Sequence, residues 1–187
     1  MSSKYALILG GAACLLDDLA RFAPLRDPAR EVVIAVNDAG YVYEGYIDHW
    51  VTLHPEKLEA WMLLRGRNLN QDYMTWSQIG GPRPANEEFL TDFTVQHWGA
   101  GSSGIFARTV SGDFLSLEKN VLCGVPMEQG PNLSGANSWW EYPDVLDVQR
   151  GGWIKNYHRI KDDTRSMSGW TKTLLGPPTA EWMEDGK

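Results

Sequence analysis

Residues 5–22 read YALILGGAACLLDDLARF: a continuous apolar run, two glycines, and then apolar residues at helical spacing. The run Tyr5–Leu9 predicts a buried strand, Gly10-Gly11 a turn and Leu15–Phe22 a helix. A strand that is apolar on both faces is typical of a parallel sheet with helices on each side. This first unit therefore predicts an α/β protein.

The same alternation recurs along the chain. Further strands are predicted at Glu31–Val36, His49–Leu53, Phe93–Val95 and Asn120–Val125. Further helices are predicted at Pro55–Trp61, Ile105–Leu117 and Glu141–Tyr157. Residues 65–88 are polar and lack periodicity, which predicts a long irregular connection with room for one short helix or strand. The pattern as a whole predicts a Rossmann-like three-layer sandwich with a mostly parallel sheet.

The length of 187 residues fits one domain with an appended segment. We expect residues 1–130 to form the Rossmann-like core and residues 131–187 to form an irregular, tryptophan-rich extension that packs on it. This second part contains Trp139, Trp140, Trp153 and Trp170. Their indole rings could stack on a base or a sugar, but packing against the sheet is the favoured interpretation.

Charge and hydropathy narrow the expected partners and location. The formal net charge of −7 argues against nonspecific nucleic-acid binding, which depends on lysine and arginine. No apolar stretch reaches the about 20 residues that a membrane helix requires. Met1–Lys4 leads into the first strand without the regions of an export signal, so a cytoplasmic protein is expected. Cys14 and Cys123 lack metal-ligand spacing and are expected to be free thiols.

Three strand-end loops carry small polar residues. Gly10-Gly11 follows the first strand, Asn37-Asp38 follows the second, and Ser102-Ser103 lies between glycines before a helix. Ligands of parallel sheets gather beyond the carboxyl ends of the strands, so these loops are candidate ligand-binding residues. Each loop also has a purely structural interpretation: a tight turn for the glycines, an Asx turn or cap for Asn37-Asp38, and a helix cap for Ser103.

Catalytic candidates are fewer. His54 lies at the end of the third predicted strand beside Glu56 and Lys57, so it could act as a general base or bind an anionic group. His158, in the C-terminal part, is a second candidate base. Each histidine is more often a structural hydrogen-bonding residue. Arg165, within TRSMSGW at residues 164–170, could fold over a ligand and clamp a phosphate, or lie in an ordinary exposed loop. No metal motif and no bound cofactor are predicted.

The order of these motifs resembles a known family. The segments are LILGGAACL at 7–15, VIAVND at 33–38, GSSG at 101–104 and VLCGVPM at 121–127. They resemble the Rossmann-like core shared by bacterial sialyltransferase-like and 6-hydroxymethylpterin pyrophosphokinase-like proteins, most of all small members encoded by bacteriophages and prophages. A phage origin would place the protein in the host cytoplasm.

The resemblance implies a nucleotide site. In the sialyltransferase-like relatives the matching motifs surround a cytidine nucleotide, which implicates Gly10, Gly11, Asn37, Ser102 and Ser103 here. The relatives' first turn reads glycine, proline, serine, whereas this chain has Ala12-Ala13-Cys14. Pro126 stands where an aspartate often follows the last strand in the relatives.

Three functions are therefore open. The first is a nucleotide-sugar-dependent glycosyltransferase with His54 or His158 as base, and with Arg165 and the glycine-serine turn at residues 101–104 near the leaving phosphate. The second is a non-catalytic nucleotide binder, such as a phage accessory protein that sequesters a host nucleotide. Pyrophosphoryl transfer is the least favoured, because carboxylates for a divalent metal are sparse at the strand ends.

Overall fold

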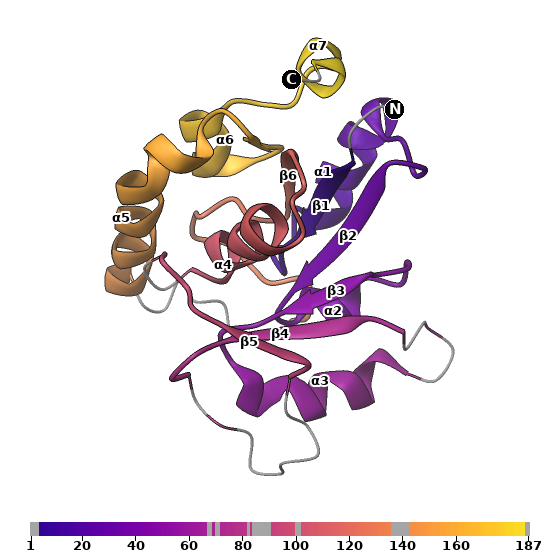
Figure 1. Ribbon diagram of the computed structural model, residues 1–187, viewed down its shortest axis with the longest axis vertical. Coiled ribbons are helices and arrows are strands. Elements are labelled where there is room, and N and C mark those ends of the chain that lie inside the picture. The colour runs from indigo at the N-terminus through magenta and orange to yellow at the C-terminus, as the bar shows by residue number, and fades with distance from the viewer. Residues whose placement is uncertain are drawn as a thin grey trace.

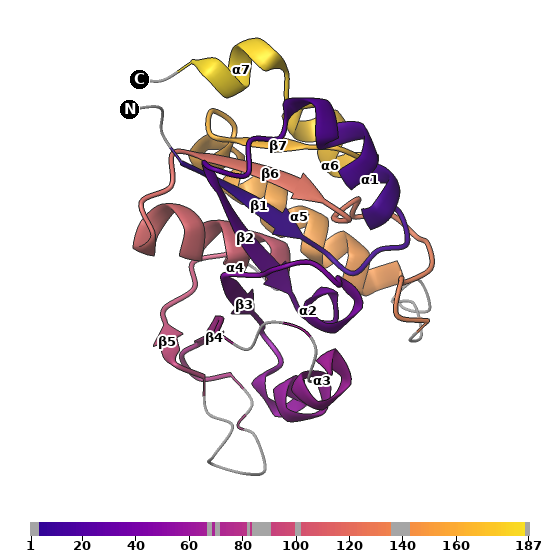
Figure 2. The ribbon, with the colours of Figure 1, turned by 90° about the vertical axis from the view of Figure 1, so that its right-hand side faces the viewer.

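The computed structural model describes residues 4–66, 69, 72–81, 83, 91–99, 102–135 and 143–185. Its centre is a seven-stranded sheet with the strand order β5-β4-β3-β2-β1-β6-β7, in which every neighbouring pair is parallel. The strands are β1 (Tyr5–Leu9), β2 (Glu31–Val36), β3 (His49–Val51), β4 (Met74–Gln78), β5 (Phe93–Val95), β6 (Lys119–Cys123) and β7 (Thr164–Ser166). The chain moves outward from β1 to β5 and then returns to the other side of β1 at β6 (Figure 2).

Helices cover both faces of the sheet, because successive strand residues point to opposite sides (Figure 1). Leu7 packs in one apolar cluster with residues of the first helices, and Ile8 packs in a second cluster with residues of the later helices. The first cluster includes residues from α1 (Leu15–Phe22), α2 (Ala39–Val42), α3 (Leu58–Arg65) and α7 (Ala180–Glu184). The second includes residues from α4 (Ser103–Thr109), α5 (Pro143–Ile160) and α6 (Gly169–Leu175). The three-layer α/β prediction is confirmed.

Several boundaries differ from the sequence-based prediction. The helix expected over Pro55–Trp61 is a 3₁₀ turn at Pro55–Lys57 followed by α3, and the helix expected over Ile105–Leu117 is α4 followed by a π-helical turn at Val110–Phe114. β4 lies within the connection that was predicted to be largely irregular.

The chain after residue 130 contributes to the sheet as well as to its cover. β7 pairs with β6, and α5 carries the fully buried Trp153. Trp170 is partly buried against the same cluster, and Trp139 and Trp140 lie outside the described residues. Cys14 and Cys123 are both unbridged. Nowhere in the described part of the chain is a helix long and apolar enough to cross a bilayer.

Candidate functional site

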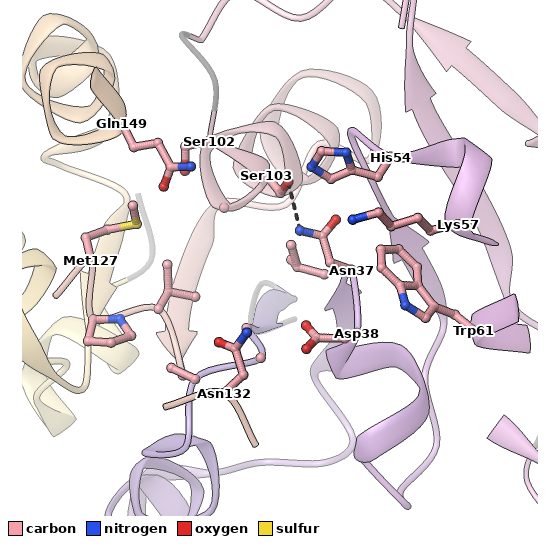
Figure 3. Close-up of a pocket in the computed structure, with 18 of the residues that line it drawn as sticks. Asn37, Asp38, His54, Lys57, Trp61, Ser102, Ser103, Met127, Asn132 and Gln149 are labelled. Atoms are coloured by element: carbon pink, nitrogen blue, oxygen red, sulfur yellow. Dashed lines mark hydrogen bonds between the residues drawn. The ribbon is translucent and has the colours of Figure 1, made fainter. Parts of the chain in front are cut away.

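A cavity of about 370 Å³ lies at the carboxyl ends of β1, β2 and β6 (Figure 3). β1 is the strand at which the order of connections reverses, and the crevice beside such a strand is where open α/β sheets bind ligands. The predicted loops converge there: the cavity is lined by Gly10, Gly11, Asn37, Asp38, His54, Ser102 and Ser103.

The floor of the cavity is shaped by two glycines in contact. A Cβ atom added to Gly10 would lie 2.3 Å from the carbonyl oxygen of Gly124, and one added to Gly124 would lie 2.4 Å from the carbonyl oxygen of Gly10. Gly124 also has a φ of +69°, which L residues with side chains rarely adopt. The sequence requires glycine at both positions because the ends of β1 and β6 meet backbone to backbone.

Most amides of the first turn are already used within the protein. Gly10 N donates to Cys123 O at 2.8 Å, Ala12 N to Gly124 O at 3.3 Å, and Ala13 N to Pro131 O at 3.0 Å. In the other direction, Leu133 N donates to Gly11 O at 2.8 Å. Segment 131–134 is thereby fixed alongside this turn, with an antiparallel bridge between Ala12 and Asn132.

Asn37 joins three loops. Its backbone has a φ of +52°, a conformation that asparagine tolerates better than most residues. Its Nδ2 donates to Ser103 Oγ at 3.0 Å, and its Oδ1 accepts from Thr52 Oγ1 at 2.9 Å. The side chain therefore holds the ends of β2 and β3 against the start of α4, so its first role is to position the wall of the cavity.

Asp38 is the carboxylate of the site. Its Oδ2 accepts a hydrogen bond from Ser134 Oγ at 2.7 Å, and its Oδ1 lies 2.1 Å from where a Cβ of Gly11 would be. Burial raises the pKa of Asp38, whereas the hydrogen bond from Ser134 and the charge of Lys57 lower it. A carboxylate with a raised pKa in a cleft is typical of a functional site.

The two serines have different surroundings. Ser102 is 2% exposed, and its Oγ accepts a hydrogen bond from Trp153 Nε1 at 3.1 Å. Ser103 is half-buried and turns its hydroxyl toward Asn37 at the cavity wall (Figure 3). The proposed capping role of Ser103 is not observed: Ser102 is the N-cap residue of α4, and its side chain makes no cap hydrogen bond.

The structure separates the two candidate histidines. His54 lies at the edge of the cavity, with its Nδ1 3.3 Å from Glu56 Oε1. His158 lies in the last turn of α5 with an exposed side chain, and it is not among the residues that line the cavity. Of the two, only His54 is placed to reach a ligand there.

Arg165 does not clamp the cavity. It lies in β7, where its Nη1 donates to the carbonyl oxygens of Lys161 and Thr164 at 2.7 and 2.8 Å. Its guanidinium stacks 4.9 Å from the ring centre of Trp182. The sequence-based expectation of a phosphate clamp is corrected here, because residues 164–166 are held as an edge strand.

Three further lining residues were not singled out from the sequence as ligand-binding: Lys57, Trp61 and Gln149. Lys57 and Trp61 follow His54 at positions three and seven, a helical spacing that places the three side chains on one face. This spacing within the predicted helix Pro55–Trp61 could have indicated that Lys57 and Trp61 lie on the same face as His54. Gln149 comes from α5, on the opposite side of the cavity (Figure 3). Among the described residues, no group of three or more His, Cys, Asp or Glu is arranged to hold a metal ion.

No family model matches the chain, and no curated protein and no solved structure matches it.

His97, on the segment that leads from β5 toward Ser102, makes the stability of the protein depend on pH. Burial lowers its pKa to about 4 from the ordinary value of 6.5, its Nε2 is buried without a hydrogen-bond partner, and its ring packs 5.1 Å from Phe106. The unfolded chain therefore binds the proton more tightly. The contribution of neutral His97 to the free energy of unfolding is therefore complete above pH 6.5 and is lost as the pH falls toward 4.

We expect His97→Asn to lose less stability than the parent between pH 7 and pH 4.5, by roughly 1–2 kcal/mol. Asparagine retains an acceptor in place of His97 Nδ1, which accepts from Gly99 N at 3.3 Å. Urea unfolding at the two pH values measures the difference, and His158→Asn, at an exposed position, is the control. Equal acid sensitivity of parent and His97→Asn would show that His97 is not responsible.

Proposed function

We propose that this protein binds a small nucleotide-like molecule in the cavity at the ends of β1, β2 and β6. The observation that carries the proposal is the convergence of Gly10-Gly11, Asn37-Asp38 and Ser102-Ser103 at the point where the strand order reverses. Such a crevice is the preferred ligand site of this class of sheet.

The lining suits a ligand that has an aromatic ring as well as hydroxyl and charged groups. The volume of about 370 Å³ falls within the range of small-molecule sites, roughly 300–1,000 Å³. Tyr41 and Trp61 offer aromatic rings on one side, and Asn132 and Gln149 offer amides that can both donate to and accept from a base edge. Asp38 can accept hydrogen bonds from sugar hydroxyls.

Thermal-shift measurements with CMP, CDP, UDP, ADP and their sugar conjugates test the proposal. A binding nucleotide at about 100 times its dissociation constant should stabilise the fold by about 2.7 kcal/mol. Replacing Ser103 by the bulkier Leu should abolish this stabilisation, because the side chain would enter the cavity and lose its hydrogen bond from Asn37.

The neighbouring serine supplies a contrast. Ser102→Leu is expected to lower the melting temperature without ligand more than Ser103→Leu does, since Ser102 is buried against Trp153 whereas Ser103 is half-buried at the cavity wall. A parent protein that no nucleotide stabilises would overturn the proposal. Stabilisation that survives in Ser103→Leu would remove this loop from the site.

Glycosyl transfer is a second candidate. It is supported by His54, whose Nδ1 lies beside Glu56 at the rim of the cavity, an arrangement that can orient an imidazole as a general base. A nucleotide sugar that stabilises the protein and is hydrolysed or transferred would favour this activity. Stabilisation without turnover would favour a binder that holds or sequesters a nucleotide.

A further inference from the structure

The first glycine turn is a poor place for the negative charge of a ligand. Three of its amides, those of Gly10, Ala12 and Ala13, donate to carbonyl oxygens of the protein. The carboxylate of Asp38 lies against Gly11 in the same part of the cavity. A phosphate there would find most donors already used and would face a like charge.

The wall formed by residues that follow β3 has the opposite character. Of the described residues that line the cavity, Lys57 alone carries a fixed positive charge, and its ammonium group points toward the centre (Figure 3). His54 lies beside it at the edge of the cavity. Ser103 Oγ, next to His54 in Figure 3, accepts from Asn37 and so keeps its own O–H proton for a ligand.

The cavity is therefore acidic beside the glycine turn and basic beside the residues that follow β3. We propose that its ligand is a ribonucleoside monophosphate or a similarly built sugar phosphate, with the phosphate at Lys57, His54 and Ser103 and the ribose hydroxyls at Asp38. This inference rests on the proposed nucleotide-binding function. Asp38, flanked by Ser134 and Gly11, accepts hydrogen bonds from hydroxyls and repels phosphate.

The test compares each ligand with its truncated form in matched variants. Titration calorimetry is carried out with a ribonucleoside monophosphate that stabilises the protein, with its nucleoside and with its 2′-deoxy analogue. In the parent, removal of the phosphate or of the 2′-hydroxyl should each weaken binding at least tenfold.

Lys57→Gln should weaken binding of the monophosphate at least tenfold and leave binding of the nucleoside unchanged. Asp38→Asn should reduce the preference for ribose over deoxyribose without weakening the contribution of the phosphate to binding. Lys155→Gln, an exposed position on α5 away from the cavity, is the control for loss of one positive charge. Lys57 is exposed, so its variant should melt at the parent temperature.

The outcomes separate the two proposals. If no nucleoside or nucleotide binds the parent, the nucleotide-binding function is overturned and this inference with it. If the monophosphate binds and Lys57→Gln leaves its affinity unchanged, or weakens nucleoside and monophosphate equally, the inference is overturned while the binding function stands. Equal affinities of the parent for the ribose and deoxyribose forms would overturn the assignment of the hydroxyls to Asp38.

Discussion

Gly124→Ala is expected to destabilise the protein by about 2–5 kcal/mol, from about 1–2 for a left-handed backbone and about 1–3 for forced overpacking. The added Cβ would lie 2.4 Å from Gly10 O and 2.9 Å from Leu15 Cβ. The first neighbour is backbone in the central strand region and cannot turn aside as a flexible side chain does. Urea unfolding followed by circular dichroism measures the loss.

Gly135→Ala is a matched control for this substitution. Gly135 has the same φ of +69° as Gly124, but an added Cβ would have no atom within 4 Å. It should therefore show only the backbone contribution, about 1–2 kcal/mol. Equal destabilisation at the two positions would mean that β1 and β6 do not meet as closely as described, and the floor of the cavity would then need another explanation.

Strands buried on both faces were the part of the fold that sequence reasoning could identify. β1 and β2 were predicted with their observed bounds, because YALIL is a continuous apolar run, EVVIAV is apolar after its first residue, and turn residues end both. β7, with the sequence TRS, carries no apolar signal. Thr164 and Ser166 are nevertheless buried, and Ser166 Oγ lies 2.8 Å from Thr171 Oγ1 of α6. This strand forms through pairing with β6 and hydroxyl hydrogen bonds, which no local pattern reports.

Some residues of the candidate site could also be placed from the sequence, and others could not. Loops that directly follow predicted strands, such as Gly10-Gly11 and Asn37-Asp38, could be placed together because parallel strands end at one edge of the sheet. Gln149 reaches the cavity from α5, and its position depends on how that helix crosses the sheet. Arg165 was placed wrongly for a related reason: the tertiary pairing that makes its segment a strand is invisible in a short polar sequence.

Asp18→Ala is expected to lower the free energy of unfolding by about 3–5 kcal/mol, since it removes charge-assisted hydrogen bonds and leaves a buried donor unpaired. Asp18 is fully buried in α1, and its Oδ2 accepts from Gly124 N at 2.8 Å and from Ser168 Oγ at 2.6 Å. Its Oδ1 pairs with Arg21. One carboxylate thus ties α1 to the turn that follows β6 and to the segment that follows β7.

Asp17→Ala is the control for this second substitution, because Asp17 lies in the same helical turn and is exposed. Loss of its charge near the helix N-terminus should cost at most about 1 kcal/mol. The stabilities of the two variants are compared by urea unfolding. Their affinities for a nucleotide are compared at a temperature where both are folded. We expect Asp18→Ala alone to weaken binding, because the Gly124 backbone that forms the cavity floor loses its anchor. If the two variants unfold at the same urea concentration, Asp18 does not anchor the turn, and the cavity floor must be held by its other contacts, such as the hydrogen bonds from Gly10 N and Ala12 N and the close approach of Gly10 and Gly124.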